Sequence, residues 1–247
     1  MTDPMSAEIP GPRRGFDPDD RQLFGGDSLA RLQEAQNDLQ WLLDRGYAKA
    51  GALDLVSRHY QLTVRQSMAI RRCTDPANLY QGRRNKQLDV SLLTGRPILI
   101  DGFNLIILLE VALSKSPIFL GRDGVYRDLA GLRGSYHLIP QTDRAIELIL
   151  SQINRCSASA ARFFLDAPVS NSGRLKSRIL DRARTFKTPV EVELVHNADT
   201  ALAGQANIAT GDSIVLDRCH SWVNLARSII ENQIPDAWVI DLSGLPL

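Results

Sequence analysis

The chain has 247 residues, of which 44% are hydrophobic and 23% are charged, and its formal net charge is +1 at pH 7. This length and composition are ordinary for a soluble globular protein with one large domain or two smaller ones. The 3 cysteines are odd in number and far apart, which excludes a disulfide framework and a CxxC metal site. The near-neutral charge indicates no particular partner, although 24 of the 29 basic residues are Arg and only 5 are Lys.

Membrane insertion and secretion are not indicated by the sequence. The longest apolar run, at residues 105–109, is far shorter than the roughly 20 residues that cross a bilayer. The N-terminus has no basic segment followed by an apolar one, as a secretory signal would. We therefore expect a cytoplasmic protein without a membrane partner.

The first part of the chain predicts a small helical domain over residues 16–75, after a flexible tail over residues 1–15 that is rich in Pro and Gly. Apolar residues spaced by three and four predict a helix that Asp27 and Ser28 cap and that ends near Gly46. Two more helices are predicted over residues 48–60 and 64–73, and Thr63 is the expected cap of the second.

The second part predicts an α/β domain over residues 96–247, after a polar, turn-rich linker over residues 76–95. Short apolar strands alternate with helical patterns, which favours a Rossmann-like parallel sheet covered on both faces. Residues 116–141 fit this rhythm poorly and are expected to form an inserted loop with a helical turn around residues 127–132. The expected strands are residues 98–100, 162–165, 190–195, 208–210 and 238–240, and the expected helices are residues 104–113, 142–155, 173–185 and 221–232.

Four aspartates fall at or just beyond the ends of successive predicted strands: Asp101, Asp166, Asp199 and Asp212. Each alone is most simply a turn or cap residue. In an open parallel sheet, however, ligands bind beyond the carboxyl ends of the strands, where all four would meet. Crowded carboxylates repel one another unless a cation neutralises them, and Mg²⁺ or Mn²⁺ prefers such oxygen ligands. The pattern predicts a site for a divalent cation.

Three of these segments resemble the PIN-like superfamily, especially its NYN branch. The LIDGFN segment at residues 99–104 is similar to the family's opening strand. NADTAL at residues 197–202 and TGDS at residues 210–213 are similar to two later acidic segments, in the family's order. The resemblance covers residues 96–247 and implies a Rossmann-like sheet and Mg²⁺- or Mn²⁺-dependent ribonuclease activity.

Carried over by position, the resemblance implies that Asp101, Asp199 and Asp212 ligate a metal and that Asn104 orients the site or contacts substrate. The family often adds an acidic residue on the next helix, where Glu110 stands about two turns beyond Asp101. A solvated helix face explains Glu110 equally well. Asp166 joins the metal candidates through its strand-end position alone.

The chain departs from the family's G-D-S-D pattern because Ile214 occupies the place of the second Asp. Asp217 is a candidate to compensate, and weakened or lost catalysis is the alternative. The whole arrangement also resembles uncharacterised bacterial and archaeal proteins with a small helical N-terminal domain of unknown function (DUF434-like). That second resemblance implies no activity.

Candidate substrate contacts lie in the segment that connects Asp166, at the end of a predicted strand, to the next predicted helix. Ser170, Asn171 and Ser172 would offer polar groups and free backbone N–H groups to a phosphate, followed by Arg174 and Lys176 on the helix. An ordinary helix cap at Ser172 is the competing interpretation.

Other basic residues would support phosphate binding. Arg122, in the tight turn at residues 121–124, would reach over the site, although the turn alone explains the segment. Residues 58–86 and 162–187 each carry seven basic residues, enough for a basic rim, but solvated helix faces explain them equally. The helices over residues 48–73 also have helix-turn-helix proportions, for which packing is the simpler explanation.

These observations predict a metal-dependent ribonuclease or related phosphodiesterase that acts on RNA or another nucleic acid. The alternative is a catalytically weak or inactive protein on the same fold that binds nucleic acid or nucleotide. An aspartyl-phosphate phosphatase is disfavoured because Phe103 stands where that chemistry needs a second Asp. Nothing in the sequence specifies an oligomeric state.

Overall fold

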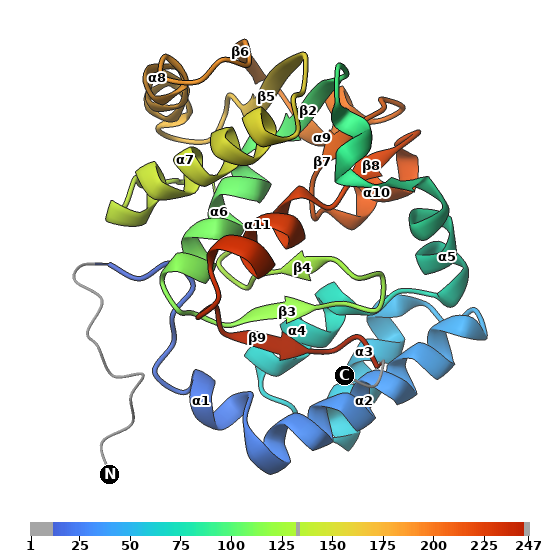
Figure 1. Cartoon of the computed structure of the whole chain (residues 1–247). Helices are drawn as coiled ribbons and strands as arrows, with labels where there is room; N and C mark the ends of the chain where they lie inside the picture. The colour runs from blue at the N-terminus through green and yellow to red at the C-terminus, as the bar shows by residue number, and fades with distance from the viewer. Residues whose placement is uncertain (1–11, 132–133, 245–247) are drawn as a thin grey trace.

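The computed structural model describes residues 12–131 and 134–244 and contains a group of N-terminal helices followed by two sheets (Figure 1). A 3₁₀ helix covers Val90–Leu93. The helices are α1 Asp20–Leu23, α2 Gly26–Asp44, α3 Lys49–His59, α4 Val64–Cys73, α5 Ala77–Lys86, α6 Gly102–Leu113, α7 Pro140–Arg155, α8 Ser172–Ala183, α9 Ala198–Leu202, α10 Ser213–Arg218 and α11 Leu225–Gln233. The strands are β1 Gln87–Leu88, β2 Pro97–Asp101, β3 Ile118–Leu120, β4 Tyr126–Arg127, β5 Ala160–Asp166, β6 Val190–Val195, β7 Ile208–Ala209, β8 Trp222–Val223 and β9 Val239–Asp241.

The three predicted N-terminal helices are present as α2, α3 and α4. Thr63 caps α4 in a reciprocal capping box, in which each of Thr63 and Gln66 accepts from the other's backbone N–H. The predicted cap of α2 is wrong by two residues: Gly25 is the N-cap, and Asp27 lies in the first turn. Leu32, Leu39 and Ile70 are fully buried between these helices.

The expected linker contains regular structure, because it holds helix α5 and the edge strand β1. Tertiary contacts stabilise α5 in place of an apolar face. Tyr80 and Arg83 are buried, and the indole N–H of Trp222 donates to the Arg83 carbonyl at 2.7 Å. Such contacts are invisible in a polar sequence, which explains why the pattern indicated a linker.

The main sheet has six strands within the described residues, all parallel, in the order β1-β8-β7-β2-β5-β6. The predicted α/β class with a Rossmann-like parallel sheet is confirmed. Strand β2 lies in the middle, with Leu99 opposite Arg162 of β5 and Ile208 of β7. The chain builds outward from β2 through β5 to β6 and then returns to β7 on the other side. The gap between β2 and β7 is therefore the switch point where such sheets bind ligands.

Helices cover both faces of the main sheet (Figure 1). Ile98 and Ile100 of β2 face a core shared with α6, α7, α8 and α11. The intervening Leu99 faces the opposite core, shared with α9 and α10. Helix α6 is apolar all round and almost wholly buried, as expected for a helix enclosed on every side.

A second sheet stands where an inserted loop was expected, with strand order β4-β3-β9. The predicted helical turn at residues 127–132 is wrong, because Tyr126 and Arg127 form β4 against β3; residue 132 lies outside the described residues. The predicted C-terminal strand exists as β9 but pairs with β3 instead of the main sheet. Phe119 and Ile240 bury this sheet against the N-terminal helices, which lie below it in Figure 1.

The start of the last predicted helix and the predicted N-terminal tail also differ from the structure. The helix expected from residue 221 begins at Leu225, because Trp222 and Val223 form β8. The expected tail lies mostly outside the described residues, but Arg13 is anchored: its Nε donates to the Ser114 carbonyl at 2.9 Å. None of the helices in the described part of the chain has the length and apolarity needed to span a membrane.

Candidate active site

Asp101 ends β2 and caps α6 at the switch point of the sheet. Its Oδ1 accepts from the Asn104 N–H at 3.4 Å, and its Oδ2 accepts from the Thr210 hydroxyl at 2.8 Å. Asn104 Oδ1 accepts from the Gly211 N–H at 2.7 Å. The first predicted segment is thus tied directly to the turn after β7, which carries Asp212.

Two glycines permit this close approach. A Cβ on Gly102 would lie 2.5 Å from a Leu165 methyl and 3.1 Å from the Phe164 carbonyl oxygen. A Cβ on Gly211 would lie 3.1 Å from the Tyr126 carbonyl oxygen and 3.2 Å from Asn104 Oδ1. A side chain at either position would force these neighbours to shift, so glycine allows the two turns to approach this closely.

Asp212 is the N-cap of α10. Its Oδ1 accepts from the backbone N–H groups of Ile214 at 2.7 Å and Val215 at 3.3 Å, which leaves Oδ2 without a hydrogen bond within the described residues. Its own N–H donates to Thr210 Oγ1 at 3.0 Å. Thr210 therefore links Asp101 and Asp212, a role that the TGDS segment alone does not reveal.

The other two aspartates, Asp199 and Asp166, come from α9 and from the end of β5. Asp199 lies in the first turn of α9, a helix capped by Asn197, and no described group donates a hydrogen bond to its carboxylate. Asp166 ends β5, and its Oδ1 accepts from the Ala198 N–H at 2.8 Å. We call Asp101, Asp166, Asp199 and Asp212 the acidic site.

The electrostatics show that these carboxylates lie close enough to repel one another. Burial, followed by the charges of Asp199 and Asp212, raises the pKa of Asp101 to about 7 against the hydrogen bond from Thr210. Burial, then Asp212 and Asp166, raises the pKa of Asp199, while Arg218 lowers it. Within the described residues, no ion pair neutralises the carboxylates of the acidic site, although Arg218 offsets part of the charge at Asp199.

The acidic site suits a hydrated hard cation better than a closed metal cage. Among the residues that the structure describes, no three His, Cys, Asp or Glu side chains are arranged to hold a metal ion. Mg²⁺ usually keeps several waters and takes only one or two protein carboxylates directly. Both oxygens of Asp199 and one each of Asp166 and Asp212 are open for this, so the donor set fits.

Glu110 does not join the acidic site. It is fully buried on α6, so the interpretation as a solvated face is wrong. Its Oε2 accepts from Arg14 Nε at 2.8 Å, and its Oε1 accepts from the hydroxyls of Tyr136, at 2.6 Å, and Thr142. Burial raises its pKa although Arg14 opposes the shift. Its contacts are those of a structural ion pair.

Asp217 does not compensate for Ile214. Its two carboxylate oxygens accept from Nε and Nη2 of Arg83 at 2.7 and 2.9 Å. Ile214 itself is 52% exposed beside Asp212 and contributes no oxygen. The departure from the PIN-like pattern therefore remains uncompensated in the described structure.

The expected phosphate contacts at the start of α8 fasten a loop instead. Ser170 Oγ accepts from the Tyr136 N–H at 3.2 Å, and the Asn171 side chain donates to the Tyr136 carbonyl at 2.6 Å. The Ser172 hydroxyl donates to the Ala167 carbonyl at 3.3 Å. Arg174 is exposed and Lys176 half-exposed, and neither forms an ion pair within the described residues.

Arg122 points to the N-terminal helices. Its Nη2 donates to the side-chain oxygen of Asn37 on α2, and its carbonyl accepts from Arg84 at 2.6 Å. The neighbouring Asp123 is buried between two arginines. These contacts hold the turn against α2 and α5.

Most basic residues of the two dense stretches also have intramolecular partners. Arg65 pairs with Asp20 at 2.5 Å, and Arg182 pairs with Asp143 at 2.5 Å. Arg218 is different: it is exposed at the end of α10, acts on Asp199 and has no ion pair in the described part of the chain. Sequence reasoning missed Arg218 because only the packing of α10 beside α9 reveals its place.

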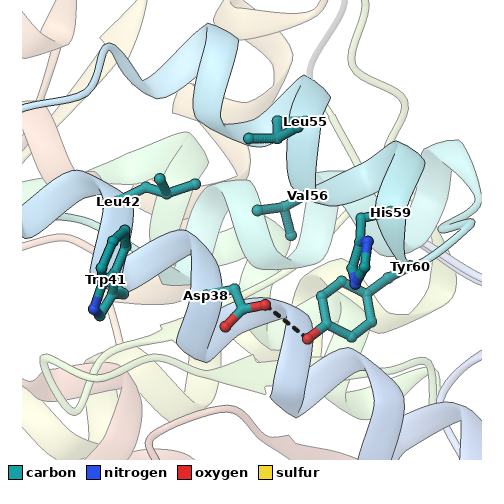
Figure 2. Close-up of a pocket in the computed structure, with 7 residues that line it drawn as sticks. All are labelled: Asp38, Trp41, Leu42, Leu55, Val56, His59 and Tyr60. Atoms are coloured by element: carbon teal, nitrogen blue, oxygen red, sulfur yellow. Dashed lines mark hydrogen bonds between the residues drawn. The ribbon is translucent and has the colours of Figure 1, made fainter.

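A separate apolar pocket of about 450 Å³ lies between α2 and α3. Figure 2 shows Tyr60 and Asp38 joined across it; the Tyr60 hydroxyl donates at 2.8 Å. None of the residues expected at a functional site lines it. The lining residues are Asp38, Trp41, Leu42, Leu55, Val56, His59 and Tyr60.

Comparisons with known proteins identify a family without an established activity. The chain belongs to the family described as Domain of unknown function (DUF5616), which matches residues 90–228. Residues 31–86 match the family described as Protein of unknown function (DUF434), which confirms the resemblance of the helical part. A protein of Methanocaldococcus jannaschii described as uncharacterised is 33% identical over 185 residues, which cover 75% of this chain and 88% of that protein. No solved structure matched the chain.

Proposed function

We propose that this DUF5616 family member is a metal-dependent ribonuclease or a related phosphodiesterase that acts at the acidic site. The observation that carries the proposal is the geometry of the acidic site: hydrogen bonds from Thr210 and Gly211 join Asp101 and Asn104 to the turn that leads to Asp212, at the carboxyl ends of β2 and β7. In agreement with this crowding, burial and the charges of Asp199 and Asp212 raise the pKa of Asp101 to about 7. Crowded, unneutralised carboxylates at the ligand-binding edge of a sheet are typical of a functional site. The resemblance of the same segments to PIN-like nucleases supports the choice of chemistry.

One or two of the open carboxylates of Asp199, Asp166 and Asp212 would hold a Mg²⁺ or Mn²⁺ ion, with water completing its shell. A bound divalent cation would neutralise phosphate charge and lower the pKa of an attacking water. The chain's own contribution is position: Thr210 and Asn104 hold Asp101 and the Asp212 turn together. Such preorganisation is what in-line displacement at phosphorus requires.

The substrate would be held by the exposed Arg218 and Arg174 and the half-buried Lys176. Arg218 lies at the end of the helix that Asp212 caps, and Arg174 and Lys176 lie on α8 after the strand that carries Asp166. Contacts to phosphates supply most of the affinity for nucleic acids without reading sequence. We therefore expect binding that weakens with salt.

A second candidate is a nucleic-acid-binding protein that no longer cleaves. Ile214 favours this candidate, because it supplies no carboxylate at the position where the PIN-like family has Asp. Asp217 cannot take over this role because it pairs with Arg83. This candidate uses the same rim of cations. Only an activity measurement separates the two.

The test is to incubate the full chain with labelled single-stranded and structured RNA, in Mn²⁺ or in EDTA. Cleavage should require Mn²⁺ and should fall on the order of a hundredfold or more in Asp199→Asn, because the site loses its most open carboxylate. Asp54→Asn, at an exposed ion pair with Arg58, is the matched control and should cleave like the wild type.

Cleavage that persists in EDTA, or in Asp101→Asn and Asp199→Asn alike, would refute the enzymatic proposal. RNA binding without any cleavage would favour the second candidate.

A further inference from the structure

A buried ion network connects the N-terminal helices to α10, the helix that Asp212 caps. At its centre, Arg83 of α5 donates from Nη1 to Asp75 at 2.9 Å and to Asp123 at 2.8 Å. Arg127 of β4 donates to both oxygens of Asp123 at 2.8 and 2.6 Å. Lys49 pairs with Asp75 at 2.6 Å, and Asp217 of α10 accepts from Arg83. Three cations face three carboxylates, so the network is neutral.

Burial makes this network geometrically demanding. The side chains of Arg83, Asp123 and Arg127 are 1%, 0% and 3% exposed. Buried ion pairs add little net stability compared with apolar packing, but removing one partner is costly. Their best-attested use is to fix one arrangement of the elements that carry them. Here those elements are α5, β4 and α10.

The network and its neighbours hold α10 at both ends. At the N-terminal end, Arg127 Nη2 donates to the Ser213 hydroxyl at 3.1 Å, one residue after Asp212. At the C-terminal end, Lys86 of α5 donates to the carbonyls of Leu216 at 2.7 Å and Asp217 at 2.9 Å. Figure 1 shows α5 beside α10. The orientation of α10 is therefore set by groups outside the main sheet.

Strand β4 also touches the turn that precedes Asp212. A Cβ on Gly211 would lie 3.1 Å from the Tyr126 carbonyl oxygen, so the two backbones are in direct contact. The next residue of β4, Arg127, reaches Ser213 on the other side of Asp212. The strand thus contacts the chain on both sides of this carboxylate.

We propose that Arg127 is a positioning residue for the acidic site: through Ser213 it fixes the turn that presents Asp212, and the buried ion network makes the N-terminal helical part a component of that site. The catalytic consequence rests on the function proposed above; the structural coupling does not. The proposed coupling gives the DUF434 region a role in building the acidic site, in addition to its packing role.

The experiment uses the full chain with Ser213→Ala and Ser213→Thr, because replacing Arg127 would leave Asp123 poorly paired and would risk unfolding. Ser213→Ala removes only the contact to Arg127, and Ser213→Thr keeps a hydroxyl. Arg58→Ala, at an exposed ion pair, is the control. Two readouts are taken: hydrogen exchange of the backbone amides of residues 211, 212, 214 and 215, and cleavage of labelled RNA in Mn²⁺.

Losing one hydrogen bond should raise exchange of these four amides about fivefold in Ser213→Ala, with wild-type exchange elsewhere in the main sheet. It should lower kcat on the order of tenfold with little change in KM, because Asp212 is displaced and not removed. Ser213→Thr should restore both values. A wild type that never cleaves refutes the proposed function, while the exchange readout still decides the coupling.

The positioning proposal is overturned if Ser213→Ala exchanges like the wild type at the four amides. It is also overturned if Ser213→Thr is as impaired as Ser213→Ala, since the hydroxyl would then not be the cause.

Discussion

Two groups of aspartates meet at α10, which Asp212 of the acidic site caps and which contains Asp217 of the buried ion network. The two groups differ in the charges that face them. In the acidic site, burial followed by neighbouring carboxylates raises the pKa of Asp101 to about 7. In the buried ion network, burial would also raise the pKa of Asp123, but Arg127 and Arg83 outweigh it and lower the pKa to about 2. Both carboxylates are almost inaccessible to solvent. Burial alone therefore does not separate a functional carboxylate from a structural one.

The groups that face each carboxylate distinguish the functional one from the structural one. Asp123 is satisfied by two guanidinium groups from its own chain, so it needs no ligand. Asp101 has one hydroxyl and one backbone N–H as partners, and the charges nearest to it are negative. A cation from solution would relieve the acidic site and would find nothing to neutralise in the network. Removing one carboxylate should therefore destabilise the protein in the buried ion network and stabilise it in the acidic site.

The largest effect is expected from Asp123→Asn. The substitution removes the carboxylate that Arg127 pairs with and leaves Arg83 with Asp75 and Asp217. Because Arg127 is then a buried cation without a carboxylate, the free energy of unfolding should fall by about 3–5 kcal/mol. Urea unfolding at pH 7, followed by tryptophan fluorescence, measures it. Asp54→Asn, whose carboxylate is 60% exposed, should change stability by less than about 1 kcal/mol. Equal losses in the two variants would contradict a structural role for the network.

The comparison also shows what the sequence can and cannot predict. The strand ends at residues 101 and 166, and the position of Asp212 shortly after β7, were predictable because apolar runs stop there and parallel strands end at a common edge. The fold class followed from the same alternation. Asp217 and Asp123 could not be distinguished from Asp212 and Asp101 by sequence, because their partner Arg83 comes from a polar helix that has no periodic signal. The role of Glu110 could not be predicted for the same reason, since its partner Arg14 is 96 residues away in the sequence.

The second small sheet was missed for a related reason. Strands β3 and β4 have only three and two residues, too short for a visible alternation. Strand β3 pairs with β9, more than a hundred residues later, and β4 pairs with β3. Phe119 of β3 is also buried against the N-terminal helices. Long-range contacts of this kind place Arg127 beside Ser213, and local patterns carry no trace of them.

An effect of opposite sign is expected from Asp101→Asn. Because the folded-state pKa of Asp101 is raised to about 7, the folded protein binds more protons than the unfolded chain between about pH 4 and pH 7. Its stability should therefore fall as the pH rises through this window and level off above it. The variant removes this loss, so at pH 8 without divalent cations it should be about 2–4 kcal/mol more stable than the wild type.

Urea unfolding of both proteins at pH 4, 6 and 8 in EDTA measures this difference. The two proteins should have nearly equal stability at pH 4, where Asp101 is protonated, and should diverge as the pH rises. A variant that is less stable than the wild type at pH 8 would show that the Asp101 carboxylate is satisfied by its neighbours, against the interpretation of an unneutralised site.

The smallest of these effects is the stabilisation of the wild type by Mn²⁺ at pH 8. A cation that binds only the folded acidic site stabilises it according to its occupancy, by about 1.4 kcal/mol when its concentration is ten times the dissociation constant. Thermal unfolding with and without Mn²⁺ measures the shift, which Asp199→Asn should reduce because Asp199 has the most open carboxylate. Asp54→Asn should keep it. The buried ion network is already neutral and offers Mn²⁺ no net charge, so a shift that persists in Asp199→Asn would place the cation outside both groups.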